Sequence, residues 1–447
     1  MSAAPPRPKL RPPKAVIEIT RDLENAGFQA WAVGGAVRDA LRGHAHLDWD
    51  LATDATPDQV RTVFGRKRTI PVGVDFGTVG VLDASGILHE VTTFRRDVRT
   101  DGRHAEVEFG ASLDEDLARR DFTVNAIAYS PSTDELRDPF EGRRDLGSRV
   151  IRAVGDPSER MREDRLRALR AIRFAARFDF EIDPSTWEAI RGSAPHLTRL
   201  SAERVRQEIE KTMDQVASPS RAMRLWRESG SIRVLVPELA SVSEEALRAL
   251  DCASQPSAGL PRRPGRRLTR LAVLFSDIPA GEALAAATRL RFSKHEAQWI
   301  AMMVERWHAL GPAMAEALSR GGPDATSVRR WIAAIGRPQL SAFFRVAGAR
   351  WEAKRAMESG DSAPAARAVH SLYRRSLRAA LSEPVDLRDL AIDGDDLRQA
   401  GIAPGPELGR ILSSLLELVL EDPRTNSRDR LLDEARRLHA VRKSTSE

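Results

Sequence analysis

Apolar and polar positions follow one pattern in the first third of the chain and another in the remainder. Segments 14–26 and 37–41 carry apolar residues at the spacing of an amphipathic helix. Short strand-like runs occupy 30–33, 46–51, 77–82 and 88–93. After Arg149 strand patterns almost vanish, and from Glu159 onward apolar residues recur every three or four positions. The pattern predicts an α+β fold, with a small mixed sheet first and an all-α part afterwards.

Breaks in the pattern indicate how the chain is organised. Residues 1–13 are rich in proline and basic residues, which predicts a disordered tail. Proline- and glycine-rich stretches at 254–266, 321–326 and 358–364 interrupt the helical part. The chain shows no internal repeat of about 20 to 50 residues, so we expect a bundle in several pieces rather than a solenoid.

Composition excludes several classes of protein. No apolar run approaches the ~20 residues of a membrane span. The single cysteine, Cys252, and the proline-rich N-terminus argue against disulfide scaffolds, thiolate zinc sites and secretion, so we expect a cytoplasmic protein. Only seven of the 70 basic residues are lysine, and the formal net charge is +6. Genomic base composition explains such a bias simply, but arginine also suits bidentate contacts with phosphates and bases, which allows a nucleic-acid partner.

The segment GGAVRDALRGHAHLDWDLAT, residues 34–53, contains the sharpest chemical motif. Gly34 and Gly35 lie between a predicted strand and a predicted helix, where bare backbone amides can approach a phosphate. Asp48 and Asp50 follow as an Asp-x-Asp pair on a predicted strand, so both carboxylates project to one side and can share divalent ions. With Arg38 near a triphosphate, this arrangement suits two-metal nucleotidyl transfer.

A zinc site is the alternative reading of the same segment. His44 and His46 precede Asp48, and together they could supply zinc ligands. No further histidine or cysteine cluster supports that reading, and Mg²⁺ prefers oxygen ligands. The sequence therefore favours magnesium over zinc.

A second motif is RRDFTVNA, residues 119–126, which we expect on a short helix. Arg120 can contact phosphates. Asp121 and Asn125, one helical turn apart, can exchange hydrogen bonds with a ribose. An ordinary helix with a cap and an ion pair remains the alternative for this motif alone.

A third motif, EDRLRALRAIRF at 163–174, carries Asp164, Arg167, Arg170 and Arg173 at three-residue spacing. On one continuous helix, successive members of this series would be only about 60° apart around the helix axis. Asp164 would accept and Arg167 would donate hydrogen bonds, which matches the edge of cytosine and adenine but not that of uracil or guanine. A solvated helix with internal ion pairs remains the alternative.

Five motifs, in this order, resemble the class II tRNA nucleotidyltransferase family, which comprises CCA-adding enzymes and bacterial poly(A) polymerases. They are GGAVRD with DWD (34–50), RRDFTVNA (119–126), DPFEGRRDL (138–146), EDRLRALRAIRF (163–174) and SAERVRQEIEK (201–211). The resemblance implies a polymerase-β-like nucleotidyltransferase head over 14–147 and a helical, base-reading neck over 148–215. It also implies a helical body over 216–355 and a helical tail over 356–447 that hold tRNA.

The resemblance also implies roles for single residues. Asp48 and Asp50 match the family's catalytic magnesium ligands. The positions that match nucleotide contacts are Gly35, Arg38, Arg120, Asp164, Arg167, Arg170 and Arg173. The implied reaction adds CCA to tRNA from CTP and ATP, with Mg²⁺ as cofactor.

Segment 92–109 resembles the family's flexible loop linked to the switch from C to A addition, which favours full CCA synthesis over CC addition only. Segment 390–426 is similar to the C-terminal part of many CCA-adding enzymes, and this similarity favours CCA addition over polyadenylation. The alternatives are a poly(A) polymerase, a tRNA-binding protein without catalysis, and a small-molecule nucleotidyltransferase. The last would not need the long, arginine-rich helical region.

Overall fold

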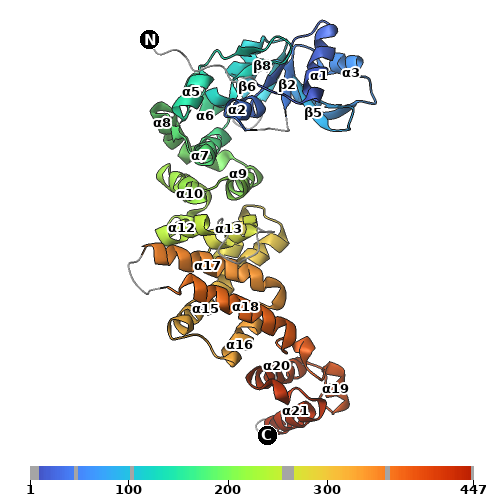
Figure 1. The fold of residues 1–447 in the computed structure, drawn as a ribbon, viewed down its shortest axis with the longest axis vertical. Helices are drawn as coiled ribbons and strands as arrows, with labels where there is room; N and C mark the ends of the chain where they lie inside the picture. The colour runs from blue at the N-terminus through green and yellow to red at the C-terminus, as the bar shows by residue number, and fades with distance from the viewer. Residues whose placement is uncertain (1–9, 45–48, 101–104, 254–265, 358–362, 444–447) are drawn as a thin grey trace. The chain divides into compact units, whose positions relative to one another are not determined.

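The computed structural model describes residues 10–44, 49–100, 105–253, 266–357 and 363–443 (Figure 1). The chain divides into two compact units. Unit 1 comprises Met1–Val216 with Arg221–Ala240, and unit 2 comprises Ala217–Ser220 with Ser241–Glu447.

Unit 1 begins with a mixed sheet of seven strands in the order β3-β4-β5-β2-β1-β8-β9. Among the described strand pairs of this sheet, only β2 and β5 are parallel. The strands are β1 (Ala30–Val33), β2 (Asp50–Thr53), β3 (Thr69–Gly73), β4 (Thr78–Leu82), β5 (Leu88–Thr93), β8 (Ala128–Ser130) and β9 (Glu135–Arg137). The predictions at 30–33 and 88–93 are confirmed to the residue, and β4 begins one residue later than expected. Of the strand expected at 46–51, residues 46–48 lie outside the described part, and β2 runs on to Thr53.

Helices α1 (Lys14–Asn25) and α3 (Pro57–Phe64) bury their apolar sides against this sheet. Val16, Ile19 and Leu23 of α1 join Leu51 and Val91 of the sheet in one core. Burying such side chains contributes about 1.5 to 3 kcal/mol each, which is why short strands with little propensity of their own form here. Helix α3 begins at a capping box in which Thr56 and Gln59 satisfy each other's backbone N–H groups.

Unit 1 contains further elements besides this sheet, α1 and α3. They are the hairpin β6 (Arg95–Thr100) and β7 (Ala105–Phe109), the helices α2 (Gly35–Leu41), α4 (Leu113–Ala118) and α5 (Gly142–Ser148), and the 3₁₀ turn η2 (Thr123–Asn125). Two short strands that the sequence pattern missed, β10 (Val150–Ile151) and β11 (Glu181–Ile182), pair in parallel. Two residues are too few to show a period, so only the paired partner reveals them.

The helical part of unit 1 consists of α6 (Pro157–Glu163), α7 (Leu166–Phe178), α8 (Pro184–Ser193), α9 (Ala202–Gln215), most of α10 (Pro219–Glu228) and α11 (Ser231–Leu235), with η3 (Ala194–Arg199) and η4 (Pro237–Leu239). The first two residues of α10 belong to unit 2. Helix α7 is buried along most of its length and contacts α9. Ile172, Phe174 and Phe178 of α7 are buried, which fixes the direction in which its arginines point.

Unit 2 is helical throughout its described residues. Its helices are α12 (Glu244–Cys252), α13 (Arg266–Leu274), α14 (Ala280–Arg289), α15 (Lys294–Ser319), α16 (Ala325–Ile335), α17 (Leu340–Met357), α18 (Ala366–Ser382), α19 (Gly394–Gln399), α20 (Pro406–Glu421) and α21 (Arg428–Lys443). Between them lie the 3₁₀ turns η5 (Arg337–Gln339), η6 (Leu387–Asp389) and η7 (Pro423–Thr425). Helix α17 contacts α12, α13 and α15, while α19, α20 and α21 share a smaller apolar core. Among the described residues, no helix combines the length and the apolar character that crossing a bilayer requires.

Candidate active site

A cavity of about 750 Å³ lies wholly within unit 1. Its lining carries nine basic side chains against three acidic ones. The lining residues are Gly34, Gly35, Arg38, Asp50, Arg119, Arg120, Asp121, Asn125, Asp164, Leu166, Arg167, Arg170, Arg173, Phe174, Arg177, Arg204, Lys211 and Gln215. Low-dielectric walls and one sign of charge focus the electrostatic field, so the cavity suits a polyanion such as a triphosphate.

The glycine turn forms one wall of this cavity. Gly34 has φ +73°, a conformation that L side chains rarely adopt, and connects β1 to α2. A Cβ atom at Gly34 would lie 2.9 Å from Nη1 of Arg120. The absence of a side chain at Gly34 therefore lets the Arg120 guanidinium lie against the turn. The approach of a phosphate to this turn stays a prediction.

Asp50 is the first residue of β2 and faces the glycine turn through strand pairing. In the antiparallel register of β1 and β2, Asp50 is the partner of Val33, which directly precedes Gly34. The exposed Asp50 lines the cavity. Asp48 and His46 lie outside the described residues, and within the described part no three His, Cys, Asp or Glu side chains form a metal-binding group. The magnesium pair and its zinc alternative both remain predictions.

The helix expected at 119–126 does not form, and this is a correction. Phe122 is extended, with φ −133°, and pairs with Ala153 in an isolated bridge, so only the single turn η2 follows it. The Phe122 ring is fully buried and meets Phe174 edge-on at 5.8 Å between ring centroids. Burial of that ring and the bridge outweigh the weak local preference for a helix.

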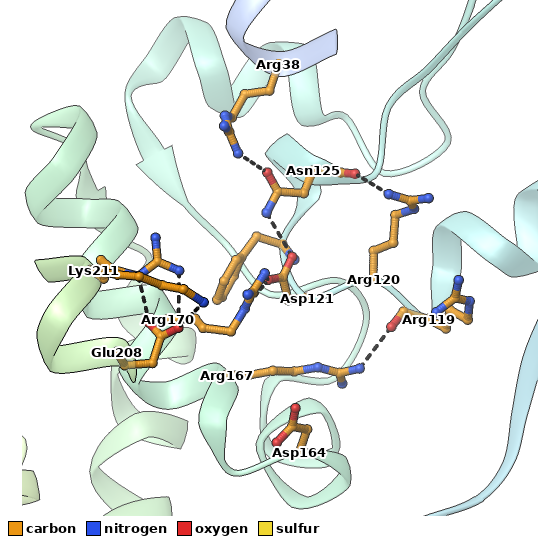
Figure 2. A network of polar contacts seen from close by, with 12 residues as sticks. Arg38, Arg119, Arg120, Asp121, Asn125, Asp164, Arg167, Arg170, Glu208 and Lys211 are labelled. Carbon is orange, nitrogen blue, oxygen red and sulfur yellow. Dashed lines mark hydrogen bonds and ion pairs between the residues drawn. The ribbon is translucent and has the colours of Figure 1, made fainter. Parts of the chain in front are cut away.

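Asp121 and Asn125 nevertheless meet, and they form the centre of a buried polar chain (Figure 2). Asn125 Nδ2 donates to Asp121 Oδ1 at 2.9 Å, and Arg38 Nη1 donates to Asn125 Oδ1 at 2.6 Å. Arg170 Nε and Nη2 both donate to Asp121 Oδ2, at 2.9 and 2.6 Å. This series of hydrogen bonds therefore connects α2, η2 and α7.

Asp121 stays ionised in this environment. Burial by itself would raise its pKa, but the positive charge of Arg170 and the hydrogen bonds from Asn125 and Arg170 outweigh it and hold the pKa below its ordinary value. The Asp121 charge in turn raises the pKa of Arg170. This ion pair keeps two charges of the cavity wall fixed.

The buried Asp116 of α4 binds both Arg119 and Arg120. Arg119 Nε donates to Asp116 Oδ1 at 2.9 Å, and Arg120 Nη2 donates to Asp116 Oδ2 at 3.2 Å. Burial would raise the pKa of Asp116, but the two guanidinium groups lower it. The arrangement orients Arg120 toward the glycine turn.

The third motif is not one continuous helix, which is the second correction. Helix α6 ends at Glu163, Asp164 is extended with φ −142° and ψ 106°, and α7 begins at Leu166. Asp164 Oδ1 accepts from the backbone N–H of Leu166 at 3.0 Å, and Oδ2 accepts from Arg204 Nη2 at 2.7 Å. An aspartate side chain that bonds to nearby backbone competes with the helix, and here it ends one and starts the next.

Arg167 therefore does not share a helix with Asp164, although both line the cavity. Its guanidinium donates to Glu163 Oε2 at 2.5 Å, to the Arg119 carbonyl at 2.9 Å and to the Arg160 carbonyl at 3.2 Å. These bonds hold Arg167 at the cavity wall. The acceptor and donor expected for base reading thus reach one cavity through local bonds together with long-range contacts to Arg204 and Arg119, not through spacing along one helix.

Helix α9 contributes residues to which sequence reasoning gave no role. Arg204, Glu208 and Lys211 occur at spacings of four and three along the fifth motif, which places them on one helical face. The buried Arg173 donates through its Nε to Glu208 Oε2 at 2.6 Å. Lys211 Nζ lies 3.5 Å from Glu208 Oε1 (Figure 2). That helical spacing in SAERVRQEIEK was the available signal.

Aromatic rings of α7 hold arginines from both parts of unit 1. The Arg38 guanidinium lies 5.4 Å from the centroid of Phe174 and 4.5 Å from that of Phe178. Arg177, at 5.3 Å from Phe178, also lines the cavity, and burial lowers its pKa. Cation–π contacts stabilise such arginines by about 0.5 to 2 kcal/mol when they are desolvated.

Comparison with known proteins matches two segments of the chain to protein families. The Poly A polymerase head domain family matches residues 30–152, and the family described as the probable RNA and SrmB-binding site of polymerase A matches residues 179–242. The chain is 32% identical over 423 residues to the CCA-adding enzyme of Streptococcus pyogenes, covering 91% of this chain and 92% of that protein. The chain belongs to the CCA-adding enzyme family.

Solved CCA-adding enzymes have the same fold. The Bacillus stearothermophilus CCA-adding enzyme in complex with CTP is 28% identical, with a TM-score of 0.74 over 97% of this chain and 98% of that chain. The Thermotoga maritima CCA-adding enzyme complexed with tRNA is 23% identical, with a TM-score of 0.65 over 94% of this chain and 93% of that chain, and it supports the fold. The expected mixed sheet followed by a largely helical region is confirmed.

Proposed function

We propose that this chain adds the terminal CCA to the 3′ end of tRNA by template-independent nucleotidyl transfer from CTP and ATP. The observation that carries this is one basic cavity in which the glycine turn, Asp50 and the Asp164–Arg167 region meet. Membership of the CCA-adding enzyme family supports the substrates. The cavity volume of about 750 Å³ is sufficient for a nucleoside triphosphate.

Asp164 and Arg167 are proposed to read the base. A carboxylate oxygen accepts from the exocyclic amino group of cytosine or adenine, and the guanidinium donates to the neighbouring ring nitrogen. Arg204 fixes the Asp164 carboxylate, and Glu163 fixes the Arg167 guanidinium. Both groups are therefore oriented before the nucleotide binds, which lowers the entropy lost on binding.

The triphosphate and the ribose are assigned to the opposite wall. Gly35 and Arg120 are proposed to contact phosphate oxygens, while Asp121 and Asn125 face the ribose. We further propose that three arginines contribute positive charge to the nucleotide site while their guanidinium groups stay bound to protein partners. They are Arg38, Arg170 and Arg173.

Asp48 and Asp50 are proposed as magnesium ligands. The described carboxylate, Asp50, lines a cavity dominated by positive charge and lies beside the glycine turn, and carboxylate oxygens are the ligands that Mg²⁺ prefers. Bound Mg²⁺ would supply activation of the attacking hydroxyl and neutralisation of the leaving pyrophosphate.

In the proposed reaction, the RNA 3′-oxygen forms a bond to the α-phosphorus of the nucleotide and releases its proton to solvent water. The bond from that phosphorus to the oxygen bridging to the β-phosphate breaks, and pyrophosphate leaves with its electron pair. The protein contributes mainly position and charge. Arg120 neutralises phosphate charge, and Asp164 and Arg167 hold the base.

The test is extension of tRNAs that lack CCA, CA or A, with CTP, ATP or both and with Mg²⁺, followed by sizing on a denaturing gel. We expect extension to stop after CCA. Long A-only tails on any RNA would identify a poly(A) polymerase instead. Binding of tRNA without extension would identify a binding protein.

A further inference from the structure

Helices α7 and α9 contact each other beside the nucleotide cavity, and their side-chain contacts show how they run. At one end, Asp164, just before α7, accepts from Arg204 near the start of α9 at 2.7 Å. At the other end, Arg177 of α7 donates to Gln215, the last residue of α9, at 3.1 Å. All four residues line the cavity. The two helices therefore run in the same direction along it, away from the proposed base-reading residues.

The far end of this wall adjoins the helix that follows the glycine turn. Arg38 of α2 and Arg177 of α7 both contact the Phe178 ring, with guanidinium carbons 4.5 and 5.3 Å from its centroid. From Arg167 to Arg177 the rise along α7 is about 15 Å. A nucleoside triphosphate in an extended form has a comparable length. A nucleotide whose base lies against Arg167 can therefore place its terminal phosphates beside Arg177.

Lys211 of α9 faces the same stretch of the cavity, and its charge is surplus. The buried Glu208 already accepts from Arg173 Nε at 2.6 Å. Lys211 Nζ lies 3.5 Å from the other oxygen of that carboxylate, so two cations share one negative charge (Figure 2). The Lys211 side chain is 43% exposed and can move toward a ligand in the cavity.

Arg177 also keeps its positive charge unbalanced. Its side-chain partner, Gln215, is neutral, and within the described part of the chain no ion pair is found for Arg177. Burial lowers the pKa of Arg177, and the positive charges of Arg38 and Arg173 lower it further, although Asp39 opposes them. Gln215 thus fixes the direction of the guanidinium without neutralising it, which suits an anionic ligand.

We infer that Arg177 and Lys211 bind the terminal phosphates of the incoming nucleotide, and the pyrophosphate that these phosphates form when they leave. This inference rests on the proposed function, which gives CTP and ATP as the nucleotides. Neither residue is among the positions that the family resemblance assigns to nucleotide contacts. Fixed cations at this end stabilise the negative charge that develops on the leaving pyrophosphate. Gln215 is a positioning residue for Arg177.

The experiment measures equilibrium binding of CTP, CMP and inorganic pyrophosphate, each with Mg²⁺, to the wild type and to R177Q/K211Q. We expect the Kd for CTP and for pyrophosphate to rise roughly tenfold or more, because charged hydrogen-bonding partners are lost. The Kd for CMP should not change, since CMP lacks the terminal phosphates. R177K/K211R keeps both charges and should retain most of the affinity.

Two further variants control for charge and for folding. K14Q/R191Q removes the same charge from unit 1, at side chains that pair with a glutamate of their own helix and do not line the cavity. We expect no change in any of the three Kd values. K211Q alone changes a partly exposed side chain, so the fold should be kept while the Kd for pyrophosphate still rises about threefold.

Four outcomes would overturn the inference. One is an unchanged Kd for pyrophosphate in both K211Q and R177Q/K211Q. Another is an equal weakening of CMP and CTP, which would show that the two residues support the base or ribose site. The third is a matching loss in the control variant. The fourth is weaker tRNA binding with unchanged pyrophosphate binding, which would assign the two cations to RNA. Failure of the proposed function is separate, because it would appear as wild-type protein that binds CTP without extending tRNA.

Discussion

Arg170 holds Asp121 through two hydrogen bonds to one carboxylate oxygen, across a sequence separation of 49 residues. Asp121 is buried, and Arg170 comes from α7, which also carries Arg167. The pair therefore connects the η2 turn, next to the glycine turn, with the helix proposed to read the base. Loss of this connection should affect both the fold and the nucleotide site.

Replacing Arg170 by Ala should lower the free energy of unfolding by about 3 kcal/mol, because it leaves a buried carboxylate without its charged partner. Urea denaturation, followed by a signal from unit 1, measures this free energy of unfolding. In the double variant R170A/D121N the loss should be smaller than the sum of the two single losses. Additive losses would show that the two residues act independently.

The same pair predicts a pH dependence. The pKa of Asp121 is lowered in the folded protein, so the ion pair stabilises the fold fully above the ordinary pKa of about 3.9. That stabilisation is lost as the pH falls below this value through the lowered pKa. In R170A the buried carboxyl lacks its charged partner and is protonated at higher pH than in the wild type. The difference in unfolding free energy between wild type and R170A should therefore be largest near pH 7 and should narrow as the pH falls toward and below about 4. A difference that stays constant down to the lowest pH at which the protein folds would contradict the assignment.

Gly34→Ala should impair nucleotide binding more than stability. A Cβ atom there meets Arg120 at 2.9 Å, and φ +73° adds strain of about 1 to 2 kcal/mol. Gly43→Ala is the matched control, because Gly43 has φ +77° but no atom within 4 Å of a Cβ position. We expect similar losses of thermal stability in both variants, but a decrease in kcat/KM for CTP of roughly tenfold only in G34A. Equal activities would remove the role of the close approach.

Asp50→Ala should abolish nucleotide transfer while leaving the fold and tRNA binding intact. Asp54→Ala is the control, because Asp54 directly follows β2 but does not line the cavity. Its carboxylate accepts a hydrogen bond from the Gln29 backbone N–H at 2.7 Å. Single-turnover extension of tRNA lacking CCA, together with circular dichroism, measures both properties. Activity retained in D50A would refute its assignment as a magnesium ligand.

Asp164→Asn should weaken the choice of CTP and ATP over UTP and GTP. An amide offers donors as well as an acceptor, so we expect selectivity to fall by roughly tenfold to a hundredfold. Asp156→Asn is the control, because Asp156 caps α6 and asparagine is an equally good cap. Misincorporation assays with each nucleotide alone measure the ratio. Unchanged selectivity in D164N would exclude Asp164 from base reading.

Local patterns predicted elements well where the apolar positions of the element face a core. Helix α1 and strands β1 and β5 follow the sequence pattern almost to the residue, because their apolar positions face one core. The pattern was wrong at Phe122 and Asp164, where an extended residue interrupts the expected helix. At Phe122 a bridge to Ala153 prevails over local helix preference, and at Asp164 a contact with Arg204 accompanies the break.

The residue types of the site, their order and the chemistry they allow follow from composition and spacing along the chain. Which partner each charged group binds depends on the folded structure. Asp121 is bound by Arg170, Asp164 by Arg204 and Arg173 by Glu208. Such pairings depend on packing between residues far apart in the chain, and short-range periodicity carries no information about them.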